Sequence, residues 1–157
     1  MTRRPAVAPL LYGLLLAAMA TGQLADADGF AAAIEGFRFL EGAAPAAAYL
    51  LPSLELAAAV LLLTSRAGPK ALGRAGGALG LALAVFWSAF AAQAFARGFA
   101  VGNCGCFGVF LVQELRWWVL LEDVYMLALA WYAAANAGLP LPRPRFGTSP
   151  ARRVVLS

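Results

Sequence analysis

Residues 76–96 decide the fold class, because they read GGALGLALAVFWSAFAAQAFA and contain no Asp, Glu, Lys or Arg. A helix needs about 20 mostly apolar residues to cross the hydrocarbon core of a bilayer, and this stretch has that length. Three further mostly apolar stretches lie at 6–23, 46–65 and 115–136. The sequence therefore predicts an all-α integral membrane protein, a bundle of four transmembrane helices.

The composition of the whole chain agrees with this prediction. Hydrophobic residues make up 62% of the sequence and charged residues only 13%, whereas soluble domains contain about 25% charged residues. This balance excludes a soluble globular protein and makes the lipid bilayer the main partner of the chain. We divide the chain into a membrane domain, residues 1–136, and a basic, Pro-rich tail, residues 137–157.

The basic residues predict the orientation of the bundle in the membrane. They gather before the first stretch, between the second and third, and after the fourth, where the positive-inside rule places cytoplasmic loops. Both termini are therefore expected in the cytoplasm, and the connections 24–45 and 97–114 outside it. This placement also explains the net charge of +4 without nucleic-acid binding. The three clusters are Arg3 and Arg4; Arg66, Lys70 and Arg74; and Arg143, Arg145, Arg152 and Arg153.

The first apolar stretch has a second interpretation. Arg3 and Arg4, the apolar run 7–20 and the triplet Ala25-Asp26-Ala27 also fit a secretory signal peptide. Cleavage would leave three spans in the same orientation, so the charges do not separate the two cases.

The first outer connection contains a second helical pattern. Phe30, Ala33, Ile34, Phe37 and Leu40 recur at helical spacing among charged residues. This pattern predicts a short interfacial helix, with a simple amphipathic linker as the alternative.

Glycines gather at the start of the third stretch. Gly73, Gly76, Gly77 and Gly80 form a pattern of small residues that lets helix backbones approach closely in lipid. We interpret this pattern as packing and assign it no chemistry.

The two cysteines of the chain stand in the motif Cys104-Gly105-Cys106-Phe107-Gly108, in the connection expected outside the cytoplasm. Gly102, Gly105 and Gly108 give the backbone the freedom to bring the two sulfurs together. Thiols in extracytoplasmic compartments tend to be oxidised, and a strained or exposed disulfide is typically labile or catalytic. The motif therefore predicts a redox-active thiol/disulfide pair.

Two alternatives to a redox pair remain open. A soft metal ion such as monovalent copper suits thiolates, although the chain has no His to complete a zinc site. The pair can also be structural, in a non-catalytic scaffold subunit. For a redox pair, the absence of a second cysteine pair means that electrons pass to or from another protein, a quinone or a small thiol.

Three acidic residues fall inside the predicted spans. Glu55 lies near the middle of the second span, and Glu122 and Asp123 lie about two turns into the fourth. Ionisable groups at such depth usually face the bundle interior. We expect them either to exchange protons with the cysteines or to pair with Arg38, Arg97 or Arg116 or with polar groups of other helices. On the fourth span, the face expected to point inward carries Trp118, Glu122, Tyr125, Leu129 and Tyr132.

The order of these features resembles the MauE/DoxX-like family of small four-span membrane proteins, over about residues 6–136. The resemblance is carried by residues 30–40, Pro52-Ser53-Leu54-Glu55-Leu56, the motif 104–108 and the run 117–123. It implies that the chain lies in the inner (plasma) membrane and helps in the maturation of periplasmic methylamine dehydrogenase. It also implies a thioredoxin-fold partner. If the chain is an enzyme, the resemblance implies a thiol–disulfide oxidoreductase with Cys104 and Cys106 as its redox pair.

Overall fold

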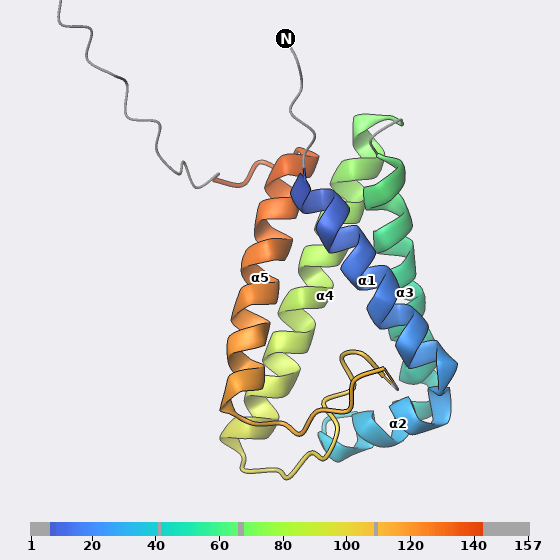
Figure 1. Ribbon diagram of the computed structural model, residues 1–157, viewed down its shortest axis with the longest axis vertical. Helices are drawn as coiled ribbons and strands as arrows, with labels where there is room; N and C mark the ends of the chain where they lie inside the picture. The colour runs from blue at the N-terminus through green and yellow to red at the C-terminus, as the bar shows by residue number, and fades with distance from the viewer. Residues whose placement is uncertain (1–6, 41, 66–67, 109, 143–157) are drawn as a thin grey trace, which may run out of the picture.

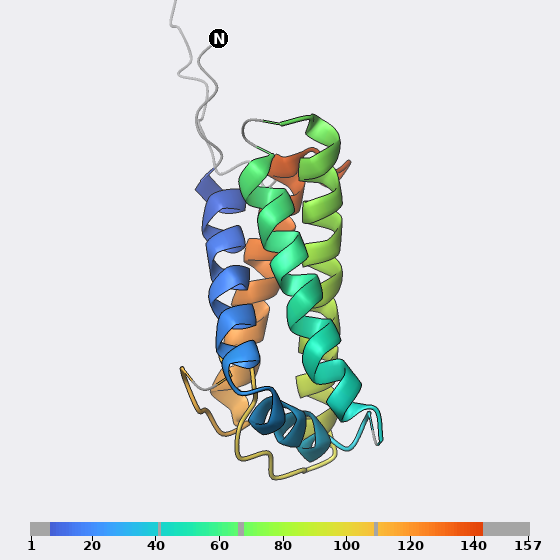
Figure 2. The ribbon, with the colours of Figure 1, turned by 90° about the vertical axis from the view of Figure 1, so that its right-hand side faces the viewer.

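The computed structural model describes residues 7–40, 42–65, 68–108 and 110–142. In these ranges the chain is helical with no strand: four long helices lie side by side and a short one lies across one end (Figures 1 and 2). The helices are α1 (Val7–Ala25), α2 (Ala27–Gly36), α3 (Ala44–Thr64), α4 (Lys70–Ala96) and α5 (Trp117–Ala137).

The four predicted transmembrane stretches correspond to α1, α3, α4 and α5. Each of these helices is long and apolar enough to cross a membrane, which confirms the fold class predicted from the sequence. The largest difference is at α4, which begins at Lys70, directly after Pro69, rather than at Gly76. Its first turns carry Lys70 and Arg74, so hydropathy alone places the start too late.

The chain divides its connections between the two ends of the bundle. The start of α1 and the end of α5 lie at one end, and α2 and the 97–116 connection lie at the other (Figure 1). Lys70 and Arg74 belong to the end away from α2. The remaining residues of the predicted basic clusters (Arg3, Arg4, Arg66, Arg143, Arg145, Arg152 and Arg153) lie outside the described residues.

The helix predicted in the first outer connection is present as α2. The Asp26 side chain caps its start by accepting a hydrogen bond from the backbone N–H of Gly29 at 2.9 Å. The side chains of Phe30 and Ile34, on the face of α2 that packs against the bundle, are buried. The helix ends at Gly36, and Phe37 lies just beyond it, stacked on Phe90 of α4 with ring centroids 4.5 Å apart. The apolar face therefore closes one end of the bundle.

The glycines of α4 pack as their spacing predicted. A Cβ atom on Gly76 would lie 2.8 Å from Leu61 Cβ of α3, and one on Gly77 would lie 3.0 Å from Ala134 Cα of α5. The Tyr12 hydroxyl of α1 donates a hydrogen bond to the Gly80 carbonyl oxygen at 2.7 Å. The glycine stripe thus lets α4 contact all three other spans.

The inward face predicted for α5 is wrong. Tyr125 is 68% exposed, and Trp118, Glu122 and Tyr132 are also exposed. Small side chains build close helix contacts in a membrane, while large aromatic ones can face lipid and the interface, so side-chain size rather than polarity decides this face. The face that packs inward carries Val119, Asp123, Ala130, Ala133 and Ala134.

Candidate functional site

The cysteine motif lies in a connection that doubles back on itself. The backbone N–H of Cys104 donates to the Gln113 carbonyl oxygen at 2.7 Å, and that of Leu115 donates to the Val101 carbonyl oxygen at 2.9 Å. Asn103 adds a local contact, because its side-chain oxygen accepts from the Gly105 N–H at 3.0 Å. These bonds fix the cysteine backbone although it belongs to no helix.

The same connection is held against the end of α1. The side-chain amide of Gln23 donates to the carbonyl oxygens of Cys106 at 3.1 Å and Gly105 at 3.4 Å. Gly105 and Gly108 have φ values of +75° and +55°, a conformation that glycine adopts readily, whereas Gly102 does not have a positive φ. A Cβ atom on Gly108 would overlap the Gly22 carbonyl oxygen. The close approach of the loop to α1 thus requires glycine at position 108.

The two cysteines occupy different surroundings. Both are free thiols in this structure. Cys104 is only 2% exposed and belongs to the apolar cluster that α2 covers, together with Phe30 and Val119. Cys106 is half-buried and its Sγ lies 3.9 Å from the Cys104 carbonyl oxygen. Cys106 is therefore the more exposed of the two residues.

The two thiols also differ in acidity. A hydrogen bond from the Cys106 thiol lowers the pKa of Cys104 below its ordinary value, in spite of its burial. The same bond, followed by burial, raises the pKa of Cys106 well above its ordinary value. A donor stabilises the thiolate that it faces, so the pair favours a Cys104 thiolate beside a protonated Cys106.

We therefore predict that removal of the Cys106 thiol raises the pKa of Cys104. In Cys106→Ala, Cys104 loses its donor, so its thiolate should form at higher pH than the first thiolate of the wild-type pair. The thiolate ultraviolet absorbance of the reduced protein, measured against pH, tests this. Cys104→Ala serves as the comparison, and an unchanged first midpoint in Cys106→Ala would contradict the assignment.

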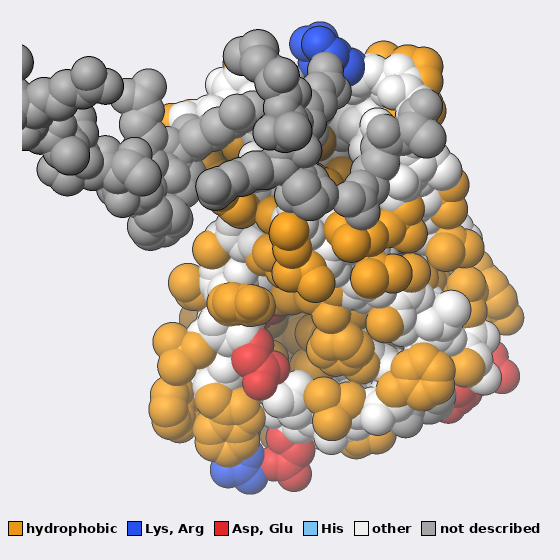
Figure 3. All heavy atoms as spheres, turned by 45° about the horizontal axis from the view of Figure 1, so that its top comes forward, with side chains coloured by type: hydrophobic (Ala, Val, Ile, Leu, Met, Phe, Trp, Pro, Cys, Tyr) orange, Lys and Arg blue, Asp and Glu red, His pale blue; other side chains and the backbone are white. Residues whose placement is uncertain are grey.

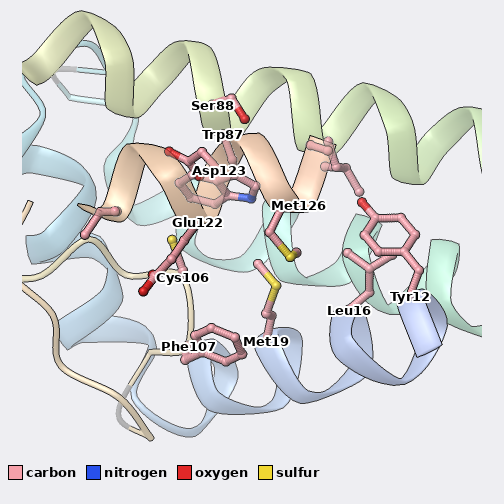
Figure 4. Close-up of a pocket in the computed structure, with 13 residues that line it drawn as sticks. Tyr12, Leu16, Met19, Trp87, Ser88, Cys106, Phe107, Glu122, Asp123 and Met126 are labelled. Atoms are coloured by element: carbon pink, nitrogen blue, oxygen red, sulfur yellow. The ribbon is translucent and has the colours of Figure 1, made fainter. Parts of the chain in front are cut away.

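Cys106 also lines a hollow between α1, α4 and α5. Figure 4 shows Cys106, Trp87, Glu122 and Asp123 together at one end of this hollow. Tyr12 and Leu16 lie at the other end, with Met19 and Met126 between them. The hollow therefore has a polar end, which contains a thiol, and an apolar end.

The three predicted acidic residues lie in different environments. Glu55 of α3 is fully buried, and one of its oxygens accepts a hydrogen bond from Trp87 Nε1 at 2.6 Å. Asp123 of α5 is 9% exposed, and its Oδ2 has no hydrogen-bond partner among the described residues. Glu122 is exposed and accepts two bonds of 3.1 Å from the Gln113 side chain. Asp123 and Glu122 thus share the hollow with Cys106, whereas Glu55 bonds to the Trp87 ring that lines it.

The arginines expected to pair with these acids have other contacts. Arg116 forms an ion pair of 2.6 Å with Glu114. Arg38 and Arg97 lie over the Phe99 ring, at 5.1 and 4.6 Å from its centroid. In the described part of the chain, no ion pair joins these arginines to the acids of the spans. The predicted alternative, a hydrogen bond to a polar group of another helix, is present for Glu55, which accepts from Trp87 of α4.

Three polar groups of the site were absent from the sequence-based prediction. Gln23 and Gln113 hold the cysteine connection, and Trp87 holds Glu55. Their partners are distant in sequence, and a glutamine near a helix end or in a loop carries no periodic signal. A polar residue at the last turn of the first span, directly after Gly22, was the one usable indication.

Comparison with known proteins gives the family of the chain. The family described as methylamine utilisation protein MauE matches residues 1–135. The chain belongs to the MauE family. A MauE relative, the methylamine utilization protein MauE of Paracoccus denitrificans, is 33% identical over 137 residues, which cover 86% of this chain and 69% of that protein. No solved structure matches.

Membership of the MauE family confirms the resemblance seen in the sequence. The match covers all four spans up to residue 135, and with them the cysteine motif and Glu55, Glu122 and Asp123. The MauE-family chain is thus a multi-pass membrane protein of a family associated with methylamine utilisation. The tail from residue 137 lies beyond the matched region.

Proposed function

We propose that this MauE-family chain is a membrane thiol/disulfide redox protein that assists the oxidative maturation of an extracytoplasmic protein, with methylamine dehydrogenase as the candidate target. The observation that carries the proposal is the asymmetric pair at the end of the bundle. Cys104 is buried with a lowered pKa, whereas Cys106 is only half-buried and lines the hollow. The Cys104 sulfur is thus suited to leave as a thiolate, and the Cys106 sulfur is suited to be attacked by the partner. Disulfide exchange needs both roles.

The exchange itself follows from this asymmetry. When the pair is oxidised, a thiolate of a thioredoxin-fold partner attacks Cys106, and the Cys104–Cys106 bond breaks with Cys104 leaving as the thiolate. The second partner thiol then attacks the partner sulfur of the mixed disulfide and releases Cys106. The partner becomes a disulfide and the pair becomes a dithiol, so two electrons have moved toward the membrane protein.

The proposed orientation places the cysteine end on the extracytoplasmic side of the inner membrane. Lys70 and Arg74 begin α4 at the opposite end of the bundle. The positive-inside rule assigns that end to the cytoplasm. A partner on the extracytoplasmic side would then approach α2 and the cysteine connection directly.

The acidic residues complete the proposal as proton carriers. Asp123 lines the same hollow as Cys106 and has an unpartnered oxygen among the described residues. It is therefore placed to take up the Cys106 proton when the pair is oxidised. Glu122, exposed at the same hollow, connects this position to the outside, and Glu55 orients the Trp87 ring.

Trapping of the mixed disulfide tests the proposed exchange. In membranes mixed with a thioredoxin-fold partner that keeps a single active-site cysteine, activated as a mixed disulfide with a small thiol, Cys104→Ser should accumulate an adduct through Cys106, because neither protein then has a second thiol to resolve it. Cys106→Ser should give far less adduct, since Cys104 is buried. Non-reducing electrophoresis with mass analysis reads the outcome, and Val112→Ser, an exposed position of the same connection, is the control. Equal adduct in the Cys104→Ser/Cys106→Ser double variant would refute the proposal.

A further inference from the structure

The hollow beside Cys106 opens to the side of the bundle rather than to its end. α1 and α5 converge where α1 begins and α5 ends, and they diverge toward the cysteine connection, with α4 behind the gap (Figure 1). Figure 3 shows hydrophobic side chains over most of this face, with a hollow among them and an acidic side chain at its edge. Because α1, α4 and α5 are spans, this opening faces lipid. A molecule that reaches Cys106 through it is lipid-soluble.

The walls of the hollow suit a flat molecule with a polar edge. The Trp87 ring forms part of the polar end. Two polar atoms there, Ser88 Oγ and Asp123 Oδ2, are buried and have no hydrogen-bond partner among the described residues. Buried polar groups normally have partners, so these two atoms mark places where a ligand oxygen can bind.

The size of the hollow requires its apolar part to adjust. The hollow has a cavity volume of about 50 Å³. Met19 and Met126 stand across the middle. Methionine is unbranched and changes rotamer readily, so these two side chains can move aside for a ring and its apolar tail.

We propose that this hollow binds a lipid-soluble quinone, which reoxidises the Cys104–Cys106 pair after each exchange. The inference rests on the proposed function, because a pair that oxidises a partner has to pass two electrons on and the chain holds no second cysteine pair. The Ser88 hydroxyl donates a hydrogen bond to a quinone oxygen, Asp123 donates a second one once it has taken the Cys106 proton, and the Trp87 ring lies against the quinone ring.

The electrons and protons balance in two steps. Cys106 gives its proton to the Asp123 carboxylate, and its sulfur forms a bond to a ring carbon of the quinone, while the C=C π bond at that carbon breaks and its electron pair moves to a quinone oxygen. The Cys104 thiolate then attacks Cys106 Sγ, so that the S–S bond forms, the C–S bond breaks, and its electron pair stays on the ring. Asp123 returns one proton and water supplies the second, equivalent to the one that Cys104 released. Overall, dithiol and quinone become disulfide and quinol.

The test follows the full-length reduced protein in detergent with decylubiquinone or with glutathione disulfide as the oxidant. Ala84 lines the hollow, whereas Val85 beside it is 53% exposed. In Ala84→Phe the added ring fills the hollow, and the rate of quinone reduction should fall on the order of 100-fold, as misplaced reactants show, while glutathione disulfide still oxidises the pair. Val85→Phe should reduce quinone at the wild-type rate. Ser88→Ala should raise the quinone concentration for half-maximal rate about fivefold, the equivalent of one lost hydrogen bond.

The possible outcomes distinguish a failure of the quinone site from a failure of the proposed thiol/disulfide function. Quinone loss, followed by absorbance, should match disulfide formation, followed by mass, one to one. Oxidation by glutathione disulfide with no quinone reduction, or equal quinone rates in Ala84→Phe and wild type, overturns the quinone site alone. A pair that neither oxidant converts to a disulfide overturns the proposed function as well.

Discussion

Cells in which Cys104 and Cys106 are both replaced by serine are expected to lose oxidative maturation of the target protein entirely. Serine has the same side-chain shape as cysteine, with a smaller atom in place of the sulfur, and forms no disulfide, so neither exchange nor reoxidation can occur. If the target is methylamine dehydrogenase, its activity should fall to that of cells without this chain, and its cysteines should be recovered as free thiols. Enzyme assay and mass analysis of alkylated target read the two effects.

The matched control is Val112→Ser, which places a serine in the same connection at an exposed position. It should leave maturation unchanged. A double serine variant that is present in the membrane at wild-type amounts and still matures its target would instead support a non-catalytic scaffold. A soft-metal protein would show stoichiometric metal binding that requires both cysteines.

Gly108→Ala is expected to release the cysteine connection from α1. Alanine at a φ of +55° costs about 1 to 2 kcal/mol, and its Cβ would also overlap the Gly22 carbonyl oxygen. Both effects separate the connection from Gln23, so buried Cys104 should become accessible. Its alkylation by a thiol reagent should accelerate about 5- to 30-fold, the rate equivalent of that free energy.

Substitution of two other glycines of the same connection distinguishes the effect of backbone strain from that of steric overlap. Gly98 has a φ of +69° but open space around it, so Gly98→Ala carries the strain without the overlap. Gly102 has open space and no positive φ, so Gly102→Ala should match wild type. Cys104 alkylation as fast in Gly102→Ala as in Gly108→Ala would contradict the role assigned to position 108.

The sequence predicted the helices and the motif because both depend on local composition. The length of an apolar stretch defines a span, and the glycines of α4 can only serve close packing. The prediction of the inward face of α5 was wrong because it relied on polarity. Polarity separates the buried face of a helix from the exposed one when water is the solvent, but it does so poorly when lipid is the solvent. Tyr125 is apolar enough for lipid, while Ala130 and Ala133 are small enough for helix contact.

The site could be predicted only in part. Cys104 and Cys106 stand in a recognisable motif, and Asp123 is conspicuous in an apolar span. Their asymmetry was not visible, because it depends on which sulfur α2 covers. The hydrogen bonds from Gln23 and Trp87 join residues that are 83 and 32 positions from their partners, and no short-range pattern reports such pairs.

The bond between Gln23 and the carbonyl oxygen of Cys106 also has a consequence for biogenesis. Gln23 emerges from the ribosome 83 residues before Cys106, so it enters the membrane without its partner. The cysteine connection acquires its docked conformation only after α4 has been inserted and the chain has returned to α1. Until then Cys104 is uncovered, and the redox centre is therefore among the last parts of the protein to mature.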